Sequence, residues 1–382
     1  MIKMKKTKFT AALLCLALTA GCAGAPKNGA EQSADTKKII KVAVTKNNTA
    51  QGDYFDEGVK RACEDMSKKY KDSGFEIKCE FYDTEDTYES VSAVTSAIAS
   101  DAEVTAIIGD DMPEICENQA DIARKAGKMC IAPVWISDDM MTDYNDSFFY
   151  MCYSNRDMGR AVKAVADTMP ELNFAVCANN GNIARYLQKE FINENADNVI
   201  DYCGMDELRV YFDNVVECWE KLGVNGVVLL RPDESTFDLL FRLKKRMPDL
   251  CIISDFGMDD QRLFKENSDV LKNIYFADGF FVDKAAENYK EYTKENGDFE
   301  DTWETHGYNV FCMIAETAVK YDTAKPYAIA ARLHENGYEG IGETFNFTKD
   351  GRLVPEVFCC WDAGAEKEIK LPAEVPEGQS VK

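Results

Sequence analysis

Residues 104–133 read VTAIIGDDMPEICENQADIARKAGKMCIAP, and this stretch decides the fold class. Residues 104–108 form a short, largely apolar and β-branched run, which is typical of a strand buried on both faces. Apolar side chains then recur at helical spacing over residues 114–126, and another short apolar run follows at 130–133. A helix between two such strands forms a crossover, so the stretch predicts two parallel strands in one sheet.

The same alternation of strand and helix continues on both sides of this stretch. The elements expected before it, in the order strand, helix, strand and helix, cover residues 39–44, 55–70, 75–82 and 88–100. The strands expected after it cover residues 174–178, 226–230, 250–254 and 273–277, with helices between them. A helical block at 284–335 and a β-rich tail complete the chain. We therefore predict the α/β class, with two Rossmann-like lobes that each contain a parallel sheet.

Composition excludes several functions. The 382 residues include 44 Lys and Arg against 67 Asp and Glu, a formal charge of −23, with only 2 His. Proteins that bind nucleic acid neutralise phosphates with Lys and Arg, so a nucleic-acid partner is not expected. With two histidines a multi-His metal site cannot be built, and no metal is expected.

The first 22 residues have the pattern of an export signal. Four lysines between residues 3 and 8 precede a short apolar run at 9–18, which is too short to span a bilayer. The following Leu18-Thr19-Ala20-Gly21-Cys22 resembles the lipobox of bacterial lipoproteins, apart from Thr19 where Leu is usual. The resemblance implies cleavage before Cys22, a lipid anchor on that residue, and an extracytoplasmic location at the membrane; an ordinary secretory signal stays open. Residues 23–38 are then expected to form a flexible tether.

Cysteines are frequent outside this segment. Of 14 in the chain, all but Cys15 and Cys22 lie beyond the signal, mostly inside apolar runs. Such positions suit buried thiols that pack as small apolar side chains. One or two disulfides stay open.

Four stretches of the chain, taken in order, match the pattern of one known family. They are Val42-Ala43-Val44 with Gln51-Gly52-Asp53 and Glu57-Gly58; Ala106-Ile107-Ile108-Gly109 with Ala126-Gly127 and Ile131-Ala132-Pro133; Gly307-Tyr308-Asn309; and Gly340-Ile341-Gly342-Glu343-Thr344-Phe345-Asn346-Phe347 with Lys349-Asp350-Gly351. Together they resemble the type I periplasmic binding proteins, specifically the branched-chain amino-acid receptors of ABC importers. The resemblance covers residues 39–361.

The resemblance implies two lobes joined by three crossings of the chain, near residues 152–155, 279–283 and 336–340. It assigns residues 39–154 and 284–336 to lobe one, residues 155–283 and 337–375 to lobe two, and residues 376–382 to a tail. It also implies that a small ligand is held between the lobes by hinge closure and delivered to the permease of an ABC importer. A protein of this kind is not an enzyme, needs no cofactor and acts as a monomer.

The ligand-binding positions depart from the family pattern. In the amino-acid receptors, hydroxyl and backbone N–H groups hold the ligand carboxylate, and an acid in lobe two holds the ammonium. This sequence has Pro113 and Ile136 where Ser and Thr are expected, and Phe256 where the acid is expected. A buried carboxylate without donors is strongly disfavoured. We therefore expect an amino acid or amino-acid-like ligand, a peptide or an amide, held in a different way.

The loops at the carboxyl ends of the strands carry the candidate ligand-binding residues. These are Asn47, Gln51, Asp110, Asp111, Met112, Trp135, Ser137, Tyr153, Asn180, Arg231, Asp233 and Asp255. Trp135 would provide a flat apolar wall, and Arg231 would hold a ligand carboxylate through two parallel hydrogen bonds. Asp110 and Asp111 would bind a cationic group. Two structural interpretations stay open: a solvent-facing turn for the two acids, and a local ion pair for Arg231.

Two other functions stay open. A ligand-sensing module of the same fold would report occupancy to a membrane signalling protein. An extracytoplasmic enzyme would use clustered carboxylates for acid–base chemistry. The sequence contains no GxGxxG, GxxxxGK[ST] or GxSxG motif, so dinucleotide enzymes, P-loop ATPases and α/β-hydrolases lack support. His306 is expected to cap or pack in the hinge region.

Overall fold

The structure is a computed structural model of the chain. It describes residues 37–46, 50–84, 87–110, 113–133, 146–179, 184, 187–188, 191, 197–231, 234–255, 270–365 and 367–373. The expected signal peptide, Cys22, nearly all of the expected tether and the tail at 376–382 lie outside these residues. No helix within the described ranges has the length and apolar character needed to cross a bilayer.

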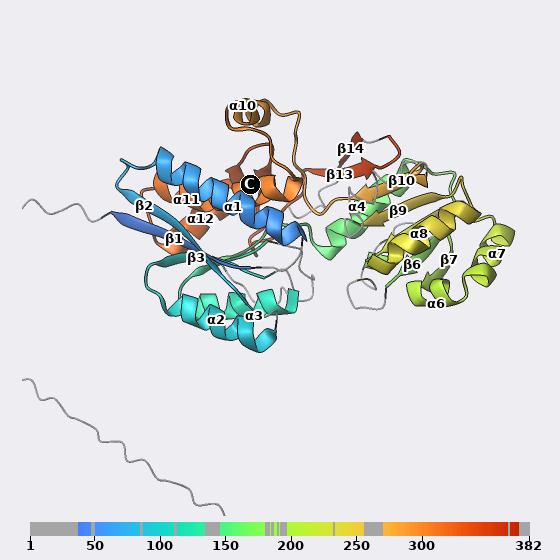
Figure 1. Cartoon of the computed structure of the whole chain (residues 1–382), viewed down its shortest axis with the longest axis horizontal. Helices are drawn as coiled ribbons and strands as arrows, with labels where there is room; N and C mark the ends of the chain where they lie inside the picture. Colours follow the sequence, from blue (N-terminus) through green and yellow to red (C-terminus); the bar gives the residue numbers. More distant parts are fainter. Residues whose placement is uncertain are drawn as a thin grey trace, which may run out of the picture. The chain divides into compact units, whose positions relative to one another are not determined.

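The first sheet contains five parallel strands in the order β2-β1-β3-β4-β5 (Figure 1). They are β1 (Lys38–Thr45), β2 (Phe75–Tyr82), β3 (Val104–Ile108), β4 (Met129–Ala132) and β5 (Phe148–Tyr150). All residues of β3, β4 and β5 are buried. Strands that are buried on both faces need a covering layer on each face of the sheet, and helices form both layers here.

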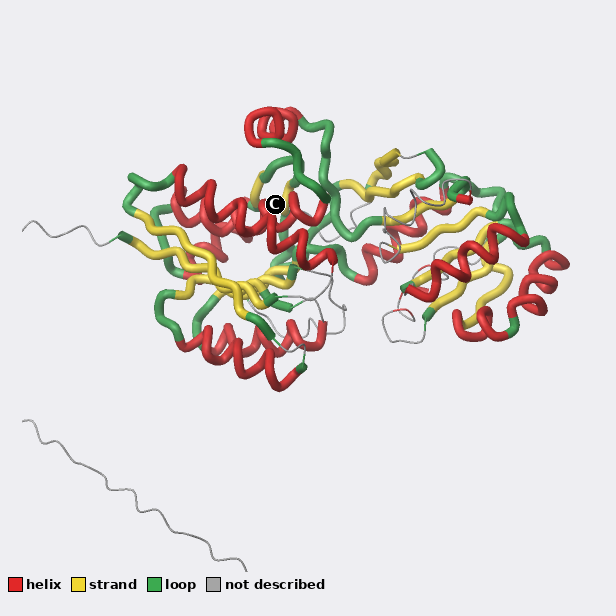
Figure 2. The backbone as a smooth tube through the Cα atoms, in the orientation of Figure 1, coloured by secondary structure: helices red, strands yellow, loops and turns green. Residues whose placement is uncertain are grey.

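Helices cover both faces of this sheet. On one face, α2 (Tyr88–Ser100) and α3 (Pro113–Lys125) pack through a small apolar cluster that includes Ile98, Ala123 and Ile107. On the other face lie α1 (Ala50–Lys69), α11 (Thr302–Lys320) and α12 (Pro326–Asn336). Figure 2 shows α1 and α11 side by side although they are far apart in the sequence.

The second sheet has seven strands in the order β14-β13-β10-β9-β8-β6-β7. They are β6 (Phe174–Ala178), β7 (Val199–Gly204), β8 (Gly226–Leu230), β9 (Cys251–Asp255), β10 (Ile274–Ala277), β13 (Val357–Asp362) and β14 (Lys367–Pro372). The strands from β6 to β10 run parallel, and β13 and β14 add to the β10 edge in antiparallel pairing. One face packs against α4 (Asn155–Asp167), and the other against α6 (Met205–Val210), α7 (Phe212–Leu222) and α8 (Glu234–Arg246).

The predicted α/β class with two parallel sheets is confirmed. The expected strands at 39–44, 75–82, 104–108, 130–133, 174–178, 226–230, 250–254 and 273–277 all correspond to observed strands. Strands β5 and β7 and helices α4, α6 and α7 were not expected from the sequence. Strand β5 has only three residues, and β7 alternates partly buried and exposed side chains, so neither gives a strong apolar run.

The chain passes between the two sheets three times. Residues 151–154 lead from β5 to α4, and residues 278–286 lead from β10 to α10 (Glu287–Asn296), which precedes α11. After α12, the short pair β11 (Tyr338–Glu339) and β12 (Thr344–Phe345) precedes β13. The Tyr150 N–H donates to the carbonyl of Gly351 at 2.9 Å, so the last of these segments stays against β5 before it reaches β13. The residues that divide one lobe from the other stay a prediction.

Candidate functional site

Four of the expected ligand-binding residues have described side chains: Asp110, Tyr153, Arg231 and Asp255. Gln51 lies in the first turn of α1, but its side chain is outside the described part. The others that lie outside the described residues are Asn47, Asp111, Met112, Trp135, Ser137, Asn180 and Asp233. The pairing that we expected between Trp135 and Arg231 across a ligand therefore stays a prediction.

Asp110 is fixed by a buried amide network at the end of β3. Its N–H donates to Gln119 Oε1 at 2.7 Å, and its side chain is almost fully buried. The Gln119 amide in turn donates to Thr45 Oγ1 at 3.2 Å, so the loops after β1 and β3 share one anchor. A Cβ on Gly109 would lie 2.7 Å from Gln119 Oε1, which explains the glycine in this turn. The network places a carboxyl group at the carboxyl end of the first sheet.

Arg231 and Asp255 come together at the carboxyl end of the second sheet. Arg231 follows β8 in a left-handed backbone conformation with φ of 56°, and its N–H donates to Asp255 Oδ2 at 3.0 Å. Asp255 is the last residue of β9 and is fully buried. Burial lowers the pKa of Arg231, and the Asp255 charge opposes that effect. The Arg231 backbone thus holds the Asp255 carboxylate, and the two residues place opposite charges at the ends of neighbouring strands.

Tyr153 joins the first connecting segment to the second and to the first residue of β13, where the third segment ends. Its N–H donates to the Gly279 carbonyl at 2.7 Å, and its hydroxyl donates to the Val357 carbonyl at 2.8 Å. The ring meets Phe358 edge-on, with centroids 5.9 Å apart. Burial raises the pKa of the Tyr153 hydroxyl well above its usual value. In this arrangement the hydroxyl is already bonded within the protein, while the ring contributes to the wall of a cavity.

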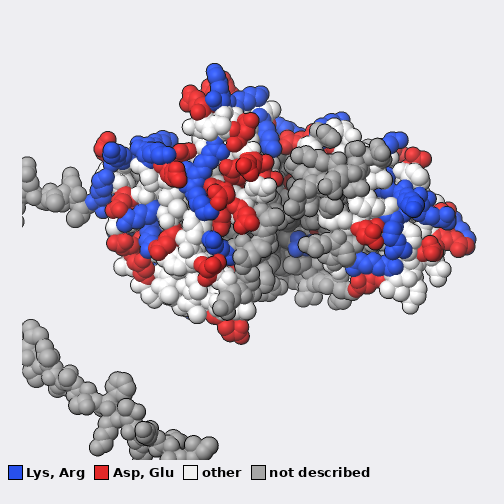
Figure 3. Space-filling view, viewed as in Figure 1, with Lys and Arg blue, Asp and Glu red and all other residues white. Residues whose placement is uncertain are grey.

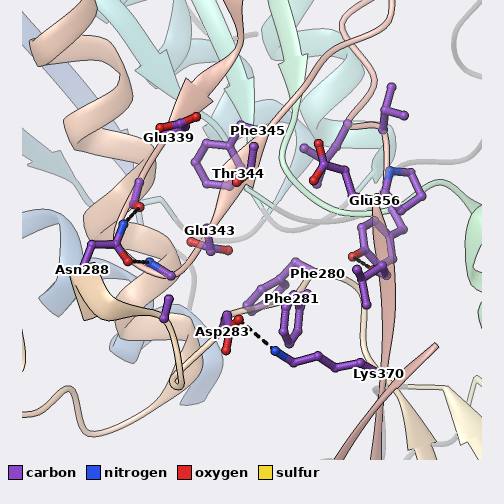
Figure 4. A pocket seen from close by; sticks show the side chains of 18 residues that line it. Phe280, Phe281, Asp283, Asn288, Glu339, Glu343, Thr344, Phe345, Glu356 and Lys370 are labelled. Atoms are coloured by element: carbon purple, nitrogen blue, oxygen red, sulfur yellow. Dashed lines mark hydrogen bonds and ion pairs between the residues drawn. The ribbon is translucent and has the colours of Figure 1, made fainter. Parts of the chain in front are cut away.

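That cavity has a volume of about 340 Å³ and lies where these segments meet (Figure 4). Phe280 and Phe281 form part of its wall, and Asp283 and Lys370 form an ion pair of 2.8 Å within it. Asn288 donates to the Gly340 carbonyl at 2.8 Å and accepts from the Gly342 N–H at 3.2 Å. The lining is therefore part aromatic and part charged, and Asp283 and Lys370 are paired with each other.

A buried polar cluster behind this wall was only partly anticipated. His306 Nδ1 lies 2.8 Å from Glu343 Oε1, and Asn309 donates to Glu343 Oε2 at 2.7 Å. The His306 ring stacks on Phe280 with centroids 4.1 Å apart and planes inclined by 17°. His306 is therefore packed, as expected, against the segment between β10 and α10; that this region is a hinge stays a prediction. Glu343 was not singled out, because an acid in a glycine-rich stretch gives no sign of burial.

No protein-family model matches the sequence, and no curated protein matches it. Among solved structures, an ABC transporter substrate-binding protein from Desulfitobacterium hafniense has a TM-score of 0.74 at 17% identity, over 87% of this chain and 100% of that chain. The branched-chain amino acid binding protein LivJ from Streptococcus pneumoniae, in complex with isoleucine, has a TM-score of 0.73 at 15% identity, over 88% and 100%. A solute-binding protein from R. palustris in complex with benzoate has a TM-score of 0.68 at 13% identity, over 89% and 98%.

These likenesses extend over nearly the full length of each matched structure, so both sheets and the segments between them are shared. All three matched proteins are named for binding a solute or substrate for an ABC transporter. The order of elements agrees with the motifs found in the sequence. The chain has the fold of the type I periplasmic binding proteins, to which the branched-chain amino-acid receptors belong.

Proposed function

We propose that this protein is an extracytoplasmic solute-binding protein. It captures a small organic ligand between its two lobes by hinge closure and delivers it to the permease of an ABC importer. The observation that carries the proposal is the placement of two buried acids, Asp110 and Asp255, at the carboxyl ends of two separate parallel sheets, with the Arg231 N–H bonded to Asp255. Ligands of open α/β sheets bind at these ends.

The charged groups support a ligand that carries both a carboxylate and a cationic or amide group. Arg231 is suited to a carboxylate, because a guanidinium presents two parallel donors. Asp110 is suited to an ammonium or an amide N–H. The matched structures with isoleucine and benzoate both hold a carboxylate-bearing ligand. The proposed ligand class is therefore an amino acid, an amino-acid-like acid, a short peptide or an amide.

The N-terminal segment supports a membrane-anchored location. A lipid on Cys22 and the tether at 23–38 would hold the binding domain at the outer face of the cell membrane or in the periplasm. On the face shown in Figure 3, the described acidic and basic side chains are interspersed. A net charge of −23 without a basic patch among the described residues of this face argues against a nucleic-acid partner.

A thermal-shift screen tests the proposal. Residues 37–382 would be heated with amino acids, short peptides, amides, aromatic acids and sugars, because a ligand that binds only the folded form raises the unfolding midpoint. We expect a specific rise of the midpoint with one carboxylate-bearing class, which isothermal titration would confirm as saturable. A flat result with folded protein would contradict solute capture and favour the ligand-sensing or interaction function. Turnover of an added compound would instead indicate an enzyme.

A further inference from the structure

Two cysteines of the second sheet lie in direct contact. Cys177 in β6 and Cys203 in β7 are register partners on neighbouring parallel strands, and their Sγ atoms are 3.2 Å apart. Both belong to the face that α6, α7 and α8 cover. The distance is shorter than two sulfur atoms in ordinary contact would show and longer than the ~2.05 Å of a disulfide. The pair is thus two thiols held against each other.

The backbone geometry allows these thiols to be joined. Neighbouring strands lie about 4.8 Å apart, which falls inside the ~4.4–6.8 Å between Cα atoms that disulfides span. Strand β7 is the edge of its sheet and is bonded only to β6 on that side. An edge strand can shift slightly without disturbing a second neighbour, so closing the sulfur–sulfur distance requires no repacking of the parallel core.

The two thiols differ in exposure. Cys177 is fully buried, whereas Cys203 is partly exposed on the edge strand. The hydrogen bond to Cys203 and burial both raise the pKa of Cys177, so its sulfur keeps its proton in the reduced protein. Cys203 is therefore the thiol that an external reagent can reach first, and Cys177 is positioned to react second.

We propose that Cys177 and Cys203 are a dithiol site that an external disulfide, either a small-molecule disulfide or the disulfide of an oxidoreductase, converts to an intramolecular disulfide. The Cys203 thiolate attacks the external disulfide, forms a mixed disulfide and releases one thiol. Cys177 gives its proton to solvent, attacks Cys203 Sγ and releases the second thiol. The protein loses two electrons and two protons, and the external disulfide is reduced to two thiols.

The bond would fasten the edge of the second sheet. It would close a loop between residues 26 positions apart in the sequence and would tie β7, together with the start of α6, to β6. Disulfides persist in extracytoplasmic compartments, where the proposed export signal would place the chain. The chemistry itself does not depend on which solute the protein binds.

Oxidation of residues 37–382 with oxidised glutathione, followed by alkylation and peptide mapping, tests the site. We expect a linked peptide that contains Cys177 and Cys203, and a rise of the thermal midpoint of about 5 °C that a reductant reverses. Cys203→Ser should remove both effects. Cys218→Ser is the matched control, because Cys218 is an exposed thiol in the same lobe that contacts no other described cysteine, and this variant should keep both effects.

Two results would overturn the proposal. One is folded protein in which Cys203 carries glutathione while Cys177 is alkylated separately, because that would show that the second attack does not occur. The other is a peptide map in which Cys203 is linked to a different cysteine. If Cys203→Ser does not fold, Cys203→Ala takes its place in the peptide-mapping experiment. Circular dichroism then shows whether the oxidised parent protein is still folded.

Discussion

Asp56 is a buried carboxyl group in the first turns of α1. Its side chain is 5% exposed, and burial raises its pKa to about 7, although Lys60 and Lys46 act in the opposite direction. A raised pKa means that the folded protein binds this proton more tightly than the unfolded chain. Stability is therefore unaffected well below pH 4, falls as the pH rises towards 7, and stays lowered above that value.

We expect Asp56→Asn to raise the free energy of unfolding by about 2–4 kcal/mol at pH 8 and by much less at pH 4. Urea unfolding of both proteins at pH 4, 6 and 8 measures the difference. Asp53→Asn is the control, because Asp53 is exposed in the same helix and should give little change at any pH. An equal gain for Asp56→Asn at every pH would show that its charge is not the cause.

A second prediction concerns Arg231, which lies beside Asp255, and it rests on the proposed function. Arg231→Lys should weaken binding of a carboxylate ligand by about tenfold or more, because lysine cannot supply two parallel donors. Isothermal titration with the ligand found in the screen measures this change. Arg160→Lys, on α4, is the control, since Arg160 pairs with Asp157 at 3.2 Å within its own helix. Unchanged affinity for Arg231→Lys would remove Arg231 from the site.

The sequence could predict that these charged residues end strands, but it could not predict their partners. The apolar runs before Asp110, Arg231 and Asp255 locate each residue at the carboxyl end of its own parallel sheet, the first sheet for Asp110 and the second for the other two. Tyr153 was expected to contact ligand, whereas its hydroxyl bonds the carbonyl of Val357, 204 positions away. No periodicity in a sequence reports a contact between such distant residues.

The contact between α1 and α11 shows, for whole elements, the same difference between what the sequence predicts and which partners the structure reveals. Gly58 and Gly307 belong to stretches that resemble the family, and the structure gives the physical reason for both. A Cβ on Gly58 would lie 2.0 Å from the Glu304 carbonyl oxygen, and one on Gly307 would lie 2.1 Å from the Phe55 carbonyl oxygen. The two helices touch through their backbones, so no other side chain fits at these positions.

Gly307→Ala should therefore lower the free energy of unfolding by about 2–3 kcal/mol, as expected when a well-packed contact is overfilled. Gly204→Ala provides the control, because nothing lies within 4 Å of a Cβ at that position and its φ is −77°. Urea titration of both variants measures the difference. Equal stability of the two variants would mean that α1 and α11 can separate without cost.

Strand prediction succeeded where burial was greatest. β3, β8 and β9 have every residue buried, and each contains a short apolar run in the sequence, although β3 includes Thr105 and β9 ends in Ser254 and Asp255. β7 lies at an edge and alternates exposed with partly buried residues, including Asp201, which accepts a hydrogen bond from Trp219 Nε1 at 2.7 Å. An edge strand with one solvated face carries a weaker signal, and only the structure could identify it.

Glu343 matters at the scale of the whole molecule. It lies in the segment that leads from α12 to the second sheet, and it bonds His306 and Asn309 of α11. Glu343→Ala should lower the free energy of unfolding by about 3 kcal/mol, since it removes the partner of His306 Nδ1 and one of the two acceptors of the Asn309 amide, both buried. Glu339→Ala, at an exposed position of the same segment, should have little effect. Urea unfolding compares the two variants, and similar losses for both would contradict this assignment.

Tyr153 has a consequence for how the two halves can move. Its backbone bonds the second connecting segment, and its hydroxyl bonds the first residue of β13, where the third segment ends. The three segments are therefore held side by side at this point. Chain segments that are joined in this way can bend together about one axis, but they resist twisting and sliding past one another. We therefore expect opening and closing to follow a single coordinate, so that one pair of fluorescent labels, one on each lobe, would report the whole motion.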